Sequence, residues 1–142
     1  MAPSARLDQA EIQKFLAGRY IAVLATVQPD GSPLAMPMWF LPDPSVITML
    51  SVDNLQKVKN LRRDPRACVT VETSAASGSD GRGVIVAGRA EFLSDGPERR
   101  ALVERFHARY PELRKHWGGL PMPANRVMFR ITPQRVGSWG LA

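Results

Sequence analysis

The fold class is decided by the stretch Tyr20-Ile21-Ala22-Val23-Leu24-Ala25-Thr26-Val27, which is followed by Gln28-Pro29-Asp30-Gly31-Ser32. The first run is apolar and β-branched, which is typical of a strand. The second combines a proline, which fixes φ, with a glycine that tolerates a positive φ, and therefore indicates a turn. A second strand over Leu34–Leu41 then completes a hairpin.

The rest of the chain repeats this pattern of short strands with helices between them. Asp8 as N-cap and Glu11 three residues later predict a helix that ends at Gly18. Pro97 opens a longer helix with Leu102, Val103, Phe106 and Tyr110 as its buried stripe, and a short helical piece is expected around Trp117. A basic helix is expected over Leu55–Arg63. Further strands are expected over Val46–Val52, Ala67–Thr73, Gly83–Ser94 and Arg126–Trp139, the last of them broken near Pro133. Six hairpin-connected strands with flanking helices predict one mainly β domain over residues 1–142, an antiparallel barrel or curled sheet.

Pro37 lies in the middle of the second strand and cannot donate a ladder hydrogen bond. This strand is therefore expected at a sheet edge, or with a bulge, and bulges tend to occur beside functional sites.

Composition limits the class of protein. The 142 residues carry a net charge of +6 and a single cysteine, Cys68, so no internal disulfide can form. The first residues, Met1–Arg6, lack the apolar core of a signal peptide, and no run is long enough to span a bilayer. We expect a cytoplasmic protein that does not bind membranes.

The residues that usually carry catalysis are scarce. His107 and His116 have no cluster of cysteines or carboxylates around them, so no metal site is expected. Cys68 falls within a predicted strand and is expected to be a small buried hydrophobe. No nucleophile elbow, P-loop or dinucleotide-binding glycine pattern occurs. No catalytic residue is therefore predicted, and an enzymatic activity would depend on a bound cofactor.

Two segments could hold such a cofactor. Lys57, Lys59 and Asn60 open the basic helix and can hold a phosphate through their charge and the helix N-terminal amides. The segment Met36-Pro37-Met38-Trp39-Phe40 can form an apolar wall for a flat ring. The alternatives are that the basic helix is a solvated surface with an exposed Lys57, and that Trp39 or Phe40 is simply core.

The order of these segments resembles the pyridoxamine 5′-phosphate oxidase-like superfamily. The resemblance rests on the hairpin quoted above, on Pro37–Phe40, on Gly88-Arg89-Ala90-Glu91 and especially on Lys57-Val58-Lys59-Asn60-Leu61-Arg62-Arg63-Asp64-Pro65-Arg66, which is similar to the deazaflavin-dependent branch. It extends from about residue 8 to residue 139. It implies a six-stranded split β-barrel of the FMN-binding type, working as a homodimer with the cofactor at the subunit interface.

Matched by position, the resemblance assigns the cofactor phosphate to Lys57, Asn60 and Ser51, with Lys59 in second place. It places the ring along Pro37, Met38 and Trp39, with Thr48 and Leu50 on the neighbouring strand. Two positions depart from the family. The chain ends at Gly137–Ala142 without the arginine and histidine that bind pyridoxal phosphate, and Lys59 stands where the family has an arginine, which loses bidentate geometry.

The resemblance implies an oxidoreductase that transfers a hydride between coenzyme F420 and a small organic acceptor. The excess of positive charge favours F420, with its polyglutamate tail, over FMN. An FMN-dependent reductase or oxidase and a non-catalytic flavin- or haem-binding protein remain as alternatives. A nucleic-acid binder is disfavoured, because the basic segment has no interleaved aromatic residues.

Overall fold

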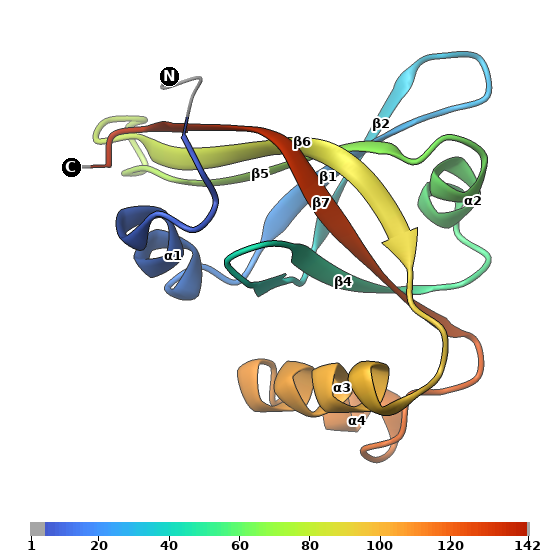
Figure 1. Cartoon of the computed structure of the whole chain (residues 1–142). Helices are drawn as coiled ribbons and strands as arrows, with labels where there is room; N and C mark the ends of the chain where they lie inside the picture. The colour runs from blue at the N-terminus through green and yellow to red at the C-terminus, as the bar shows by residue number, and fades with distance from the viewer. Residues whose placement is uncertain (1–4, 142) are drawn as a thin grey trace.

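The computed structural model describes residues 5–141, which form a curled antiparallel sheet with helices at its ends and on one side (Figure 1). The helices are α1 (Ala10–Ala17), α2 (Gln56–Arg63), α3 (Pro97–Arg109) and α4 (Leu113–Trp117). The strands are β1 (Ala22–Val27), β2 (Pro33–Met38), β3 (Leu41–Pro42), β4 (Ile47–Val52), β5 (Arg66–Thr73), β6 (Arg82–Phe92) and β7 (Arg126–Trp139). The prediction of a mainly β split-barrel fold is confirmed, with the two-residue β3 in addition to the six expected strands.

The sheet has the strand order β2-β1-β5-β6-β7-β4-β3. β2 is an edge strand, as Pro37 predicts, and its pairing with β1 runs without a register shift from Val27↔Pro33 to Ala22↔Met38. Pro37 therefore marks an edge and no bulge. The chain passes from β2 at one edge directly to β3 at the other, so the two edges of the curled sheet come close together.

The expected strand over Leu34–Leu41 is divided in two at Trp39 and Phe40. The Tyr110 hydroxyl accepts a hydrogen bond from the Phe40 N–H at 2.9 Å and lies 3.0 Å from the Phe40 carbonyl oxygen. Phe40 thus satisfies its backbone groups with the side chain of Tyr110, the C-cap residue of α3, and not with a neighbouring strand. It is also fully buried, as expected of one of this aromatic pair.

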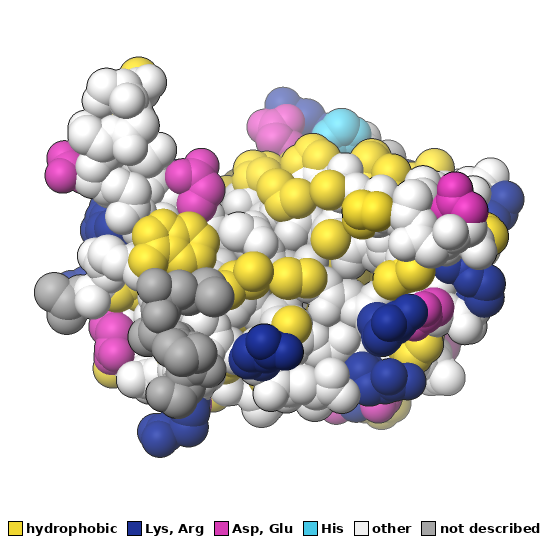
Figure 2. All heavy atoms as spheres, turned by 90° about the horizontal axis from the view of Figure 1, so that it is seen from above, with side chains coloured by type: hydrophobic (Ala, Val, Ile, Leu, Met, Phe, Trp, Pro, Cys, Tyr) yellow, Lys and Arg dark blue, Asp and Glu magenta, His cyan; other side chains and the backbone are white. Residues whose placement is uncertain are grey.

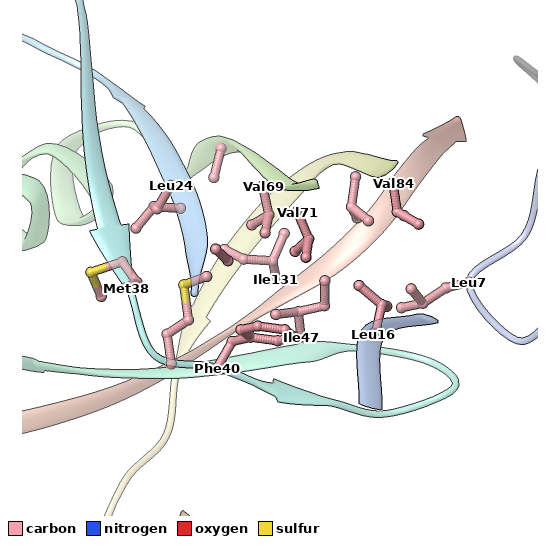
Figure 3. Packing of buried hydrophobic residues seen from close by; sticks show 14 of the residues in the cluster. Leu7, Leu16, Leu24, Met38, Phe40, Ile47, Val69, Val71, Val84 and Ile131 are labelled. Atoms are coloured by element: carbon pink, nitrogen blue, oxygen red, sulfur yellow. The ribbon is translucent and has the colours of Figure 1, made fainter. Parts of the chain in front are cut away.

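The core fills the inside of the curled sheet. Its side chains come from α1, from α2 and from every strand except β3, and Leu24, Phe40, Ile47, Val69 and Ile131 are among those that converge there (Figure 3). A second cluster packs α3 and α4 against the other side of β4 and β7, with Val103, Phe106, Tyr110, Leu113 and Met128 at its centre. Leu102 is only partly buried in this cluster.

Three local predictions need correction. α1 begins at Ala10 with Gln9 as its N-cap, because Asp8 pairs with Arg6 at 3.0 Å and makes no cap bond. β7 continues through Pro133, and the irregularity is a register shift in its pairing with β6 between Ala87 and Gly88. A Cβ on Gly88 would lie 2.0 Å from the Thr132 carbonyl oxygen, so this close approach requires glycine.

The third correction concerns Cys68. It lies on β5 as expected but is only half-buried, because its side chain belongs to the outer face of the sheet. Burial raises the pKa of its thiol.

Candidate functional site

A cavity of about 440 Å³ opens where the ends of β2 and β4 meet the first turn of α2 and the short helix α4. Its walls are mostly apolar, and Lys57, His116 and Arg126 are the only ionisable side chains that residues 5–141 contribute to it. None of the aspartates and glutamates in that range lines it. A cavity with cations, no acids and low-polarity walls favours an anionic ligand.

Lys57 lies in the first turn of α2 and is only 9% exposed, so the expectation of an exposed lysine is wrong. Its ammonium donates a hydrogen bond to the Met38 sulfur at 3.0 Å. A thioether is a weak acceptor. Among residues 5–141, no carboxylate forms an ion pair with Lys57, and burial lowers its pKa.

The N-terminus of α2 opens beside this ammonium. Leu55 is the N-cap and no side chain caps the helix. The amides of Val58 and Lys59 bond to the Leu55 carbonyl oxygen, whereas no intrahelical partner exists for those of the first helical residues. Free amides and a positive helix end add to the attraction that Lys57 exerts on an anion.

Asn60 fixes α2 to the sheet. It is fully buried, and its amide nitrogen donates to the Thr26 hydroxyl of β1 at 3.0 Å. Its oxygen accepts from Gln56 Nε2 at 2.8 Å. These bonds orient the helix, and Lys57, one turn earlier, points toward Met38 as a result.

β4 supplies the opposite wall with Leu50, Ser51 and Val52. The Ser51 hydroxyl donates to the Val52 carbonyl oxygen at 3.0 Å and keeps its lone pairs for another donor. Thr48 lies two residues before Leu50 on the same face of β4, beneath the α3 side of the sheet, and is buried away from the cavity.

Trp39 forms the aromatic part of the wall. Its ring stacks on Tyr110 with centroids 4.5 Å apart and planes within 6°. The His116 ring meets its edge at 6.2 Å. Since Tyr110 is itself held by hydrogen bonds to the backbone, the indole has a fixed position before any ligand arrives.

The cavity gathers six of the nine predicted cofactor-binding residues, which are Pro37, Met38, Trp39, Leu50, Ser51 and Lys57. Thr48, Lys59 and Asn60 do not line it: Lys59 is exposed to solvent and the other two are buried. Contact of any of the nine with a cofactor stays a prediction.

Seven residues that complete the cavity were not predicted from the sequence. Ile21 comes from the approach to β1, Leu55 from the α2 N-cap, and Val52 and Arg126 from the paired ends of β4 and β7. α4 adds Leu113, His116 and Trp117. The one available signal was the cluster of aromatic and basic residues at 113–117, which lies far from the cavity's other residues along the chain.

Residues 5–141 contain neither a metal-binding cluster nor a membrane-spanning helix. Among residues 5–141 no group of three or more histidine, cysteine, aspartate or glutamate side chains could hold a metal ion. No helix within the same range is long and apolar enough to cross a membrane.

The family model described as Pyridoxamine 5'-phosphate oxidase matches residues 8–140 of the chain. The comparison with curated proteins found no match. Among solved structures, the conserved hypothetical protein Rv2991 from Mycobacterium tuberculosis is 31% identical, with a TM-score of 0.74 over 92% of this chain and 83% of that chain.

Two further solved structures are similar to this chain. An F420 reductase is 26% identical, with a TM-score of 0.66 over 88% of this chain and 94% of that chain. HutZ, a haem storage protein from Vibrio cholerae, is 19% identical, with a TM-score of 0.77 over 95% of this chain and 94% of that chain. At 19% identity the likeness to HutZ shows a shared fold only.

Proposed function

Because this chain belongs to the pyridoxamine 5′-phosphate oxidase family, we propose that it is an oxidoreductase whose cofactor binds in the cavity beside Lys57. The preferred cofactor is coenzyme F420, and the reaction is hydride transfer between it and a small organic acceptor.

The observation that carries this proposal is the buried ammonium of Lys57. Burying a charge without a counter-ion is costly, and proteins normally pair such a group. Within the described part of the chain, the ammonium has only a methionine sulfur as its partner, and no aspartate or glutamate lines the cavity that it faces. A phosphate at the α2 N-terminus would supply the missing counter-charge.

The remaining walls fit a flat ring. Pro37, Met38 and Trp39 provide one apolar side and Leu50 the other, and the indole is held rigidly by Tyr110. When bound, a flavin or deazaflavin supplies the hydride chemistry, and the protein needs no acid–base residue of its own for that step. The chain's residues bind the phosphate, orient the ring and exclude water from it.

F420 is preferred over FMN for two reasons. The cavity and the chain both carry an excess of positive charge, which suits a cofactor with several anionic groups. The similar F420 reductase extends over 88% of this chain. FMN remains the alternative.

A non-catalytic haem-binding protein is the second candidate. His116 is exposed at the edge of an aromatic cavity, and a neutral imidazole can ligate haem iron. This reading predicts a haem spectrum that is lost in His116→Ala, and no turnover with a flavin or deazaflavin.

Titration of the purified protein with F420 and FMN tests the proposed function. We expect binding of F420 that is tighter than that of FMN, and Lys57→Met should weaken both about tenfold to a hundredfold, because a charge-assisted contact is lost. Lys14→Met, which removes an exposed lysine on α1, is the control. Equal cofactor affinities of Lys57→Met and Lys14→Met would show that Lys57 does not contact the cofactor.

We further propose that a second copy of the chain covers the outer face of β2, β1, β5 and β6. Val23, Thr70 and Ile85 lie in register on this face, Cys68 lies two residues from Thr70 on the same face, and all four are at least partly exposed. Figure 2 shows hydrophobic side chains in a band across it. Ile21 and Pro37 belong both to this region and to the cavity, so a partner docked here would close the cavity's open side.

Thr70→Arg tests this assembly, because it places a charge in the middle of the apolar face. We expect the wild-type protein to be a dimer by light scattering at micromolar concentration, and Thr70→Arg to be a monomer. Gln134→Arg, an exposed position on β7, should stay dimeric. A wild-type monomer that retains bound cofactor would contradict the proposed assembly.

A further inference from the structure

We infer that Arg126 binds a second anionic group of the cofactor, and that this residue sets the preference between cofactors with one anionic group and those with an extended anionic tail. The inference rests on the proposed function, since it concerns the same cavity, but it involves a residue outside the basic helix.

Arg126 opens β7 opposite Val52 of β4 and is half-buried in the cavity wall. Its guanidinium donates to the Asn125 side-chain oxygen at 2.7 Å. Within residues 5–141 no carboxylate forms an ion pair with it. The nearby Asp53 bonds to Asn125 through backbone atoms, and its carboxylate does not line the cavity.

The next arginine on this face of the strand is different. Arg130 lies four residues further along β7 and pairs with Glu91 at 2.8 Å and with Glu98 at 3.2 Å. Two arginines on one face of one strand therefore have opposite electrostatic surroundings: Arg130 is neutralised by acids of β6 and α3, and Arg126 is left with its donors available to the cavity.

Lys57 and Arg126 reach the cavity from different walls. The Lys57 ammonium lies against Met38 at the end of β2, whereas Arg126 belongs to the paired ends of β4 and β7. A phosphate bound at the α2 N-terminus occupies Lys57. The guanidinium on the other wall is then free for a further phosphate or carboxylate, which it can hold with two parallel hydrogen bonds.

In this arrangement, the number of anionic groups on the ligand decides whether Arg126 contributes to its affinity. FMN carries one phosphate. FAD adds a second phosphate, and F420 adds carboxylates beyond its phosphodiester. Calorimetry measures the affinities of wild-type protein, Arg126→Gln and Lys57→Met for riboflavin, FMN, FAD and F420. Comparing the two variants separates the contribution of Lys57 from that of Arg126. Comparing FAD with F420 shows whether Arg126 binds a phosphate or a carboxylate. Arg114→Gln, an exposed arginine on α4 outside the cavity lining, is the matched control.

We expect Arg126→Gln to weaken binding of FAD, F420 or both about tenfold, with FMN changed less than twofold. Loss for FAD alone assigns a phosphate to Arg126, and loss for F420 alone assigns a carboxylate. If Arg126→Gln loses as much affinity for FMN as for the other cofactors, or loses affinity for none of them, the inference is overturned. The affinities of Lys57→Met test the phosphate site independently of that result. If wild-type protein binds FMN no better than riboflavin, the phosphate site itself fails and the inference falls with it.

Discussion

Two cationic side chains, Arg109 at the end of α3 and Lys57 in the first turn of α2, are both drawn into the protein, and their surroundings differ. The Arg109 guanidinium donates to the carbonyl oxygens of Leu16 at 3.2 Å and Ala17 at 3.3 Å, and also to that of Arg19. It lies 4.9 Å from the ring centroids of Tyr20 and Phe40. Lys57 has one weak sulfur acceptor.

The difference separates a cation that is satisfied within the chain from one that has no counter-ion among residues 5–141. Arg109 donates to carbonyl groups at the end of α1 and joins that helix to α3, so its charge is used within the chain. The cost of burying Lys57 is not offset by any group of the described chain. Four measurements test this contrast.

Arg109→Ala should have the largest effect. It removes several hydrogen bonds to a charged group and uncaps α1, so we expect the free energy of unfolding to fall by about 3 kcal/mol. Urea denaturation measures the change. Arg105→Ala, which removes an exposed ion pair with Asp43, should cost less than about 1 kcal/mol. A similar fall in the free energy of unfolding in the two variants would show that Arg109 has no special structural role.

Asn60→Ala should lower the free energy of unfolding by about 2 kcal/mol, because the buried Thr26 hydroxyl loses its partner. The cofactor should also bind more weakly, since α2 no longer holds Lys57 in place. Asn60→Leu combined with Thr26→Val removes both polar groups and should recover part of the stability. Recovery of cofactor affinity in the double variant would contradict a positioning role for Asn60.

Cofactor affinity should fall at alkaline pH. Burial lowers the pKa of Lys57 below its ordinary value of 10.5, so the free protein loses this proton at a lower pH than the unfolded chain does. An anion binds the protonated form, and affinity above that pKa should therefore drop up to about tenfold per pH unit. Titrations from neutral to alkaline pH measure the slope, and Lys57→Met should remove the part of it that Lys57 causes.

The same lowered pKa predicts how stability changes without cofactor. Between the pKa in the folded protein and 10.5, only the unfolded chain holds the proton, so the folded state gains stability as pH rises through that window. Below the window the buried charge is a penalty. Lys57→Met should accordingly raise the free energy of unfolding near neutral pH by about 1 kcal/mol, and a loss of stability would show that the ammonium is already satisfied.

Local sequence signals predicted most of the elements and half of the cavity. The apolar run before Pro29, the proline in β2 and the basic run at 57–66 identified the hairpin, an edge strand and α2. These features depend on residues close in the chain, where φ restrictions and alternation act directly. The apolar segment at 36–40 and the basic residue Lys57 could be recognised for the same reason, whereas Leu50 and Ser51 were assigned only through the family resemblance.

The charge state and partners of these residues were decided by the tertiary structure. The sequence determined that the chain has a basic helix, and it did not show that Lys57 turns inward while Lys59 turns to solvent. It contained Tyr110, but the bonds of that hydroxyl to Phe40 are made seventy positions away along the chain. His116 and Arg126 joined the site because α4 and β7 return to the open end of the sheet. Burial and pairing are properties of the folded surroundings, which long-range packing creates and no local pattern encodes.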